Sequence, residues 1–152
     1  MPAAHTDPSD VNDENMETFV LMGSVPNTDS RLAAVLEELE RREPVFHRSE
    51  FGTTRRDFEN MTDAAFWEVG ASGRRYSRQF VIDTLVERYS QPHDDVWETS
   101  GFHCAELAPD AYLLTYTLVQ DEARVTRRAS IWRRTQDGWK ILYHQGTLVE
   151  SP

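Results

Sequence analysis

The sequence has a single cysteine, Cys104, and no long apolar run. One thiol cannot form an internal disulfide, which is typical of proteins in a reducing compartment. A membrane-spanning helix needs about 20 mostly apolar residues, and a secretory signal needs a charged and then apolar N-terminus. Since neither pattern is present, we expect a cytoplasmic protein with no membrane partner.

Positive charge is also scarce, and it is unevenly placed. The chain of 152 residues has a formal net charge of −10, and all 16 of its Lys and Arg residues lie after residue 30. An acidic chain without a basic stripe is a poor binder of nucleic-acid phosphates or anionic lipid. Residues 1–29 combine acids with three prolines and little apolar surface, so we predict a mobile acidic arm there and one domain over 30–152. The apolar patch 19–22 could dock on the body or on a partner.

Metal and phosphate motifs are missing as well. His47, His93 and His103 are scattered, without the close spacing of zinc ligands. The glycines of 70–73 are not followed by the Lys-Ser/Thr pair of a phosphate-binding loop. We therefore expect no metal and no cofactor.

What the sequence does contain is a β-rich stretch over 112–147. Three strand-like runs follow one another, and Asp137-Gly138 suits a tight hairpin. A two-residue loop would pair Gln136 with Trp139, whereas a four-residue loop would pair Arg134 with Trp139. Both registers predict the same two faces. One face carries Arg128, Ser130, Trp132, Ile141, Tyr143 and Gln145, and the other carries Ala129, Ile131, Arg133, Lys140, Leu142 and His144.

The rest of the chain places helical patterns before these strands. Asp29 or Ser30 can cap a first helix, Thr54 with Asp57 resembles a capping box, and Ser77 can cap a third helix. One strand is expected at 65–69, and another over 96–107 with a bulge near Gly101. Helices separated from antiparallel strands indicate an α+β fold. We predict a curved antiparallel sheet wrapped around the N-terminal helices, forming a cone with an internal pocket.

Several segments resemble a known superfamily. They are 66–76 (FWEVGASGRRY), 130–134 (SIWRR), 138–141 (GWKI) and 144–147 (HQGT). In this order of elements they are similar to the SnoaL-like branch of the nuclear-transport-factor-2-like (NTF2-like) superfamily, and to bacterial members of unknown function within it. The likeness covers residues 30–149. It implies a cone fold and a homodimer packed through its sheets, but not one activity, because the superfamily holds ketosteroid isomerases, polyketide cyclases, dehydratases and non-catalytic binding domains.

The ketosteroid isomerase pattern carries over only in part. Glu68 lies close to the position of the catalytic carboxylate base. No tyrosine lies between Ser30 and Met61, and neither Ser130 nor Trp132 is acidic, so the donor pair of the isomerases is missing. Isomerase chemistry on a steroid is therefore not expected.

The predicted site combines one acid–base group with a set of ligand-binding side chains. Glu68 is the candidate catalytic residue, since a carboxyl in an apolar cavity has a raised pKa. The candidate ligand-binding residues are Phe66, Arg128, Ser130, Trp132, Tyr143 and Gln145. Because His144 lies on the opposite face of the predicted hairpin, we expect it to have a structural role and not a catalytic one. Two functions stay open: a pocket for a small hydrophobic or aromatic molecule with lyase or isomerase chemistry, and a non-catalytic ligand-binding or dimerisation module.

Overall fold

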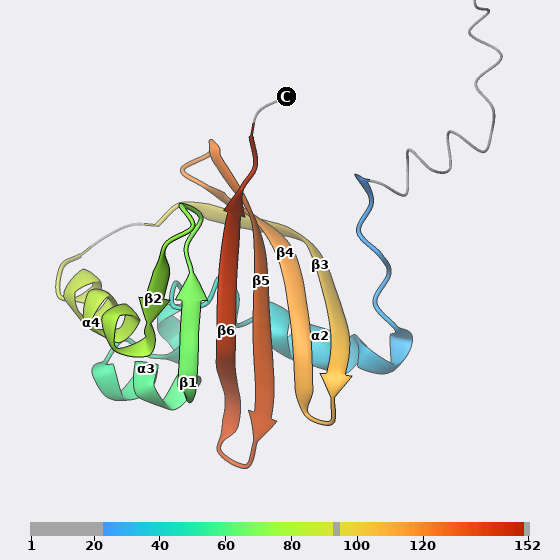
Figure 1. Ribbon diagram of the computed structural model, residues 1–152, viewed down its shortest axis with the longest axis horizontal. Coiled ribbons are helices and arrows are strands. Elements are labelled where there is room, and N and C mark those ends of the chain that lie inside the picture. Colours follow the sequence, from blue (N-terminus) through green and yellow to red (C-terminus); the bar gives the residue numbers. More distant parts are fainter. Residues whose placement is uncertain (1–22, 93–94, 151–152) are drawn as a thin grey trace, which may run out of the picture.

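A computed structural model describes residues 23–92 and 95–150 of the chain. Within them, short helices pack against one face of a six-stranded sheet (Figure 1). The helical elements are η2 (Ser30–Leu32), α2 (Ala33–Glu40), η3 (Ser49–Phe51), α3 (Arg55–Met61) and α4 (Arg78–Tyr89). The strands are β1 (Thr62–Val69), β2 (Arg75–Ser77), β3 (Trp97–Ala108), β4 (Ala111–Gln120), β5 (Arg124–Thr135) and β6 (Gly138–Leu148). The predicted α+β class is confirmed.

The helix starts lie where the capping residues predicted them. Asp29 caps η2 through the backbone N–H of Arg31. Thr54 and Asp57 form a complete capping box at α3, and Ser77 accepts from the N–H of Phe80 at α4. Each cap satisfies backbone donors that the first helical turn leaves unpaired. These local signals therefore fix the helices that later cover the sheet.

The sheet is curved, unclosed and mixed. Its strand order is β2-β1-β6-β5-β4-β3, and every pairing is antiparallel except the one between β1 and β6 (Figure 1). The predicted sheet was entirely antiparallel, so this one pairing is a correction. It arises because the chain leaves β1, forms β2, α4 and the strands β3 to β5, and then returns beside β1 in the same direction. The bulge expected near Gly101 is present, with the register of β3 shifting between Ser100 and His103.

A bulge in β6 changes which side chains face inward. The hairpin pairs Arg134 with Trp139, and this register continues to Trp132 and Ile141. The next pair is Ile131 with Tyr143, so Leu142 is an extra residue. One inserted residue moves every later side chain of a strand to the opposite face. The faces predicted for Tyr143, Gln145 and His144 are therefore wrong.

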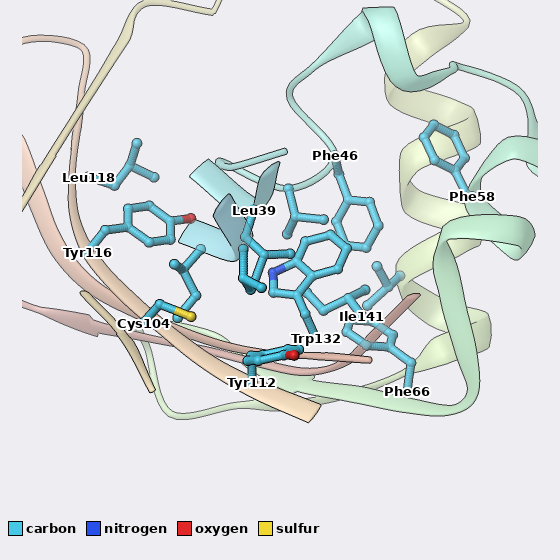
Figure 2. Close-up of a cluster of buried hydrophobic side chains, with 14 of the residues drawn as sticks. Leu39, Phe46, Phe58, Phe66, Cys104, Tyr112, Tyr116, Leu118, Trp132 and Ile141 are labelled. Atoms are coloured by element: carbon cyan, nitrogen blue, oxygen red, sulfur yellow. The ribbon is translucent and has the colours of Figure 1, made fainter. Parts of the chain in front are cut away.

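The core lies between the helices and the concave face of the sheet. It contains Leu39 of α2, Phe58 of α3 and Ile141 of β6, all nearly fully buried (Figure 2). Ile82 of α4 and Leu114 of β4 belong to the same core. The alternating buried positions of β4 point into it, as the pleat of a half-exposed strand requires. Phe66, predicted to bind a ligand, belongs to this core and packs edge-on against Phe46.

The N-terminal segment can be followed only from residue 23. Thr28 already contacts the sheet, since its hydroxyl accepts a hydrogen bond from the backbone N–H of Cys104 at 3.1 Å. Most of the predicted arm, with the patch 19–22, lies outside the described residues, and the boundary at residue 29 stays a prediction. Over the described ranges, none of the helices has both the length and the apolar composition needed to cross a bilayer.

Candidate functional site

A cavity of about 420 Å³ opens beside the concave face of the sheet, under α4 and the loop before η3. Its apolar lining comprises Val45, Phe46, Tyr76, Phe80, Val81 and Leu85. Its polar and charged lining comprises His47, Glu68, Arg74, Thr84, Arg88, Gln120, Arg124, Arg128 and His144. Apolar walls with a few converging polar groups are typical of small-molecule sites. This is the candidate functional site of the chain.

Glu68 is a half-buried carboxylate on β1 that lines this cavity. Burial raises its pKa, while the positive charges of Arg128 and Arg88 oppose the rise. A carboxyl group with a raised pKa is closer to the neutral range in which proton transfer is efficient. The structure therefore places the predicted acid–base candidate in a cavity; its catalytic role stays a prediction.

Glu68, His144 and Ser130 lie side by side on the neighbouring strands β1, β6 and β5. Glu68 pairs with His144 of β6, and His144 pairs with Ser130 of β5. The Ser130 hydroxyl lies 2.7 Å from Nδ1 of His144 and 2.5 Å from Oε1 of Glu43. The cavity is thus connected, through His144 and Ser130, to a carboxylate beneath it.

Glu43 is fully buried between the helical layer and the sheet. Its Oε1 accepts hydrogen bonds from Ser130 and from Trp132 Nε1, and its Oε2 accepts from the Tyr116 hydroxyl and the backbone N–H of Val45. Burial raises the pKa of Glu43, while these four donors oppose the rise. Burial also raises the pKa of Tyr116 well above its usual value, which keeps the phenol protonated and able to donate. The carboxylate is therefore the acceptor at the centre of a buried network.

The donors of this network determine the tautomer of His144. Ser130 has one hydroxyl proton, and it is directed to Glu43, so Nδ1 of His144 must carry the proton that joins it to Ser130. Nε2 is then free to accept from Nη1 of Arg128, which lies 3.3 Å away. Burial and the positive charge of Arg128 lower the pKa of His144 to about 3. His144 is therefore neutral at physiological pH.

Arg128 extends along the floor of the cavity in a fixed position. Its Nε donates to the Thr126 hydroxyl at 2.8 Å, and its Nη1 donates to His144. The guanidinium lies flat on Gly146, where an added Cβ would be 3.0 Å from Cζ. Burial lowers the pKa of Arg128, although the group stays charged. A glycine at 146 is thus what allows the guanidinium to lie against β6.

A second hollow, of about 320 Å³, lies on the other side of the loop 45–46. Arg42, Arg48, Met61, Trp132 and Trp139 are among its lining residues, and it shares Val45 and Phe46 with the first cavity. The backbone of Phe46 has a positive φ of 71°, and its carbonyl accepts a hydrogen bond from Tyr89 at 2.5 Å. This loop is consequently a fixed partition between two cavities.

The structure brings together only part of the predicted ligand-binding set. Arg128 lines the cavity as predicted, while Ser130 and Trp132 lie on the concave face but donate to Glu43. Tyr143 and Gln145 lie on the outer face, where the Tyr143 hydroxyl donates to the side chain of Gln145. The cause is the bulge at Leu142. These two residues are removed from the proposed site.

Three residues of the site were missed. His144 was assigned to the wrong face, His47 was considered only as a metal ligand, and Glu43 was not considered at all. His47 lines the cavity and contacts Asp95 through Nδ1 at 2.9 Å, and burial lowers its pKa. One signal in the sequence favours the bulge: Ile141, Leu142 and Tyr143 are three apolar residues in a row, which breaks the alternation of a half-exposed strand.

No group of three or more His, Cys, Asp or Glu side chains within the described ranges could hold a metal ion. The acid–base groups of the cavity instead have other neighbours: arginines for Glu68, Ser130 and Arg128 for His144, and Asp95 for His47.

Comparisons with solved structures define the class of fold. The chain has an NTF2-like, cystatin-like fold, as its resemblance to the SnoaL-like branch predicted. It is similar over 80% of its length to the whole of an NTF2-like protein from Cytophaga hutchinsonii, with a TM-score of 0.59 and 10% identity. It also resembles a candidate dehydratase of the NTF2-like family from Streptomyces avermitilis, with a TM-score of 0.61 and 15% identity over 78% of this chain and 98% of that one.

A third similar structure is an uncharacterised cystatin-like-fold protein from Caulobacter vibrioides, with a TM-score of 0.57 and 14% identity over 80% of this chain and 89% of that one. No protein-family model matches the sequence, and no curated protein matches it. At these identities the likeness establishes the fold, and function has to be argued from the site.

Proposed function

We propose that the protein binds a small organic molecule in the 420 Å³ cavity and that Glu68 exchanges a proton with it. The observation that carries this proposal is the placement of a half-buried carboxylate, with a raised pKa, among Phe46, Tyr76, Phe80 and Leu85. Such a group can remove a proton from a carbon or oxygen atom and return it, as lyases and isomerases require. One of the similar structures is described as a candidate dehydratase, and elimination of water is a lyase-type reaction, which is consistent with this class.

The surrounding groups suit such a reaction. Removal of a proton leaves negative charge on the bound molecule, and the guanidinium groups of Arg128 and Arg88 line the same cavity. Preorganised donors and positive charge stabilise a developing anion, particularly where water is largely excluded. Glu68 would act as the base, and these groups would hold the charge that it creates.

Replacement of Glu68 by Gln separates catalysis from binding. The substitution keeps the size and polarity of the side chain but removes its ability to accept a proton, so we expect proton exchange to fall by about 100-fold or more. The measurement has two steps: mass spectrometry identifies compounds that co-purify with the protein, and NMR in D₂O follows exchange of their hydrogens. Glu87→Gln, on the exposed side of α4, is the matched control and should exchange at the wild-type rate. Undiminished exchange in Glu68→Gln would remove Glu68 from the reaction.

A passive binding module is the alternative. In it the cavity holds a ligand but Glu68 serves only to complement charge, since it is within electrostatic reach of Arg128 and Arg88. The same experiment separates the two functions: a compound that binds to wild type and never exchanges hydrogen favours the passive module. The single buried thiol of Cys104 is consistent with the cytoplasm as the working compartment of either form.

We also propose a homodimer formed through the outer face of the sheet. Trp67 of β1 is 44% exposed there and packs against Tyr143, with ring centroids 4.8 Å apart. Ile131 and Leu113 pair beside them on the same face. The face also holds both charge signs, since Arg133 contacts Asp63, so it can complement a second copy of itself.

Sedimentation equilibrium at micromolar concentration tests the dimer. We expect wild type to sediment at twice the 17.6 kDa of the chain, and Trp67→Asp to sediment as a monomer because it buries a charge in the interface. Ala34→Asp adds the same charge on the exposed side of α2 and should leave the dimer intact. A monomeric wild type would end this proposal.

A further inference from the structure

We propose that the ligand of this cavity carries a carboxylate, or another anionic group, on an apolar or aromatic body, and that Arg128 binds that group. This inference rests on the proposed function, because it assigns a ligand class to the same cavity. It goes further by naming the chemistry that the cavity selects and the residue that selects it.

The charges around the cavity are opposite to those of the whole chain. Although the protein has a net charge of −10, the cavity is lined by four arginines and one carboxylate, Glu68. The arginines are Arg74, Arg88, Arg124 and Arg128. Among the described residues, none of the four forms a salt bridge with a carboxylate. Unpaired cations that converge on one cavity attract an anionic ligand.

Arg128 differs from the other three because it is half-buried. Its Nε and Nη1 are directed to Thr126 and His144, both of which are neutral acceptors. A guanidinium taken out of water without a carboxylate hydrogen-bonded to it costs free energy, and a bound carboxylate would provide that partner through charge-assisted hydrogen bonds. The fixed position of the group on Gly146 reduces the entropy lost when a ligand binds.

Neither Glu43 nor His144 neutralises the positive charge of Arg128, so that charge stays available to a ligand. Glu43 is the buried carboxylate of the network, but its four hydrogen bonds come from Ser130, Trp132, Tyr116 and Val45 and none from Arg128. His144 is held neutral and accepts from Arg128 without neutralising it. The network thus separates the buried negative charge from the positive charge that faces the cavity.

The opposite wall supplies the apolar part of the site. Tyr76 and Phe80 stack with ring centroids 5.1 Å apart, and Val81 and Leu85 of α4 line the cavity beside them. Flat aromatic walls favour a planar or cyclic apolar body. A volume of about 420 Å³ accommodates a molecule of one or two fused rings.

The test uses two probes of nearly equal shape, 2-naphthoate and 2-naphthamide. Isothermal titration calorimetry on the wild-type protein should show the anion binding at least tenfold more tightly than the amide. Arg128→Met should weaken naphthoate binding by about tenfold or more and change naphthamide binding less than twofold. Arg127→Met is the matched control: the neighbouring arginine is on the outer face, where it donates to Thr117, and its loss should leave both affinities unchanged.

A second variant tests the same site in case Arg128→Met fails to fold. Gly146→Ala keeps every charge but places a Cβ against the guanidinium, so it should also weaken naphthoate selectively. Thr84→Trp, at an exposed position of α4 that lines the cavity, should abolish binding of both probes and confirm where they bind. Equal affinities for the two probes, both lost in Thr84→Trp, would overturn the anion site and leave the cavity proposal standing. Binding of neither probe, or binding that Thr84→Trp does not affect, would overturn both.

Discussion

Replacement of Glu43 by Gln should destabilise the protein by about 2–4 kcal/mol, although the two side chains have nearly the same shape. The reason is that each carboxylate oxygen accepts from a group that can only donate: Trp132 Nε1 contacts Oε1, and the backbone N–H of Val45 contacts Oε2. A glutamine has one oxygen, so its NH₂ group must face one of these donors in either orientation. A buried donor would then lose its acceptor.

Urea unfolding followed by tryptophan fluorescence measures this effect. Glu40→Gln is the matched control, because Glu40 is exposed at the end of α2 and its substitution should change the free energy of unfolding by less than about 0.5 kcal/mol. If Glu43→Gln were as stable as wild type, the carboxylate would not be the required acceptor of the network. Glu43 would then be protonated in the native protein, with Ser130 or Tyr116 accepting its proton.

The stability of the protein should also fall as the pH is lowered below 7, because His144 resists protonation when folded. Its pKa is about 3 in the native state and near 6.5 in the unfolded chain, so between these values only the unfolded chain binds the proton. The stabilisation is complete above pH 6.5 and is lost as the pH falls towards 3. Between pH 7 and 5.5 this one group should cost about 1 kcal/mol.

A His144→Asn variant isolates that contribution. Asparagine places an amide near the position of Nδ1, where it can still donate to Ser130, but it does not titrate. The wild type should therefore lose about 1 kcal/mol more than the variant between pH 7 and 5.5, as measured by urea unfolding at each pH. His47, whose pKa burial also lowers, contributes equally to both proteins and cancels in the difference. Glu43 acts with the opposite sign, since a raised carboxyl pKa adds stability on acidification. Parallel pH profiles for the two proteins would show that His144 binds protons equally in the folded and unfolded states, which contradicts a lowered native pKa.

Local signals in the sequence predicted most of the helices and strands. Caps at Asp29, Thr54 and Ser77 predicted three helix starts, and the hairpin at Asp137-Gly138 left two partners open for Trp139, of which Arg134 is the one observed. Both kinds of signal depend on interactions within a few residues, which a sequence displays directly. The parallel pairing of β1 with β6 could not be found this way, because it joins strands separated by most of the domain.

The candidate site was predictable only up to the first irregularity in its strands. Arg128, Ser130 and Trp132 were assigned to the correct face, since β5 is regular there. Beyond Leu142 each assignment on β6 was reversed, because one extra residue exchanges the two faces of a strand. Tyr143 was thereby placed inside, and His144 outside.

Glu43 was missed for a different reason. It follows Arg41 and Arg42 at the end of a helix, where charged residues are usually exposed to solvent. Its four donors come from distant strands and from the turn after it, and only the folded chain brings them together. Burial of a charge depends on the whole set of its partners, so no local pattern reveals it.

If a ligand binds at Arg128 as proposed, the side chain of Phe46 would limit its length. It stands between two hollows that together would form a passage from α4 to the tip of the β5–β6 hairpin. A molecule anchored at Arg128 can grow only until it reaches this ring, whereas a smaller residue at position 46 would let the same anchor hold an extended chain. Related proteins with this scaffold could therefore differ in preferred ligand length through one wall residue, while their acid–base groups stay the same.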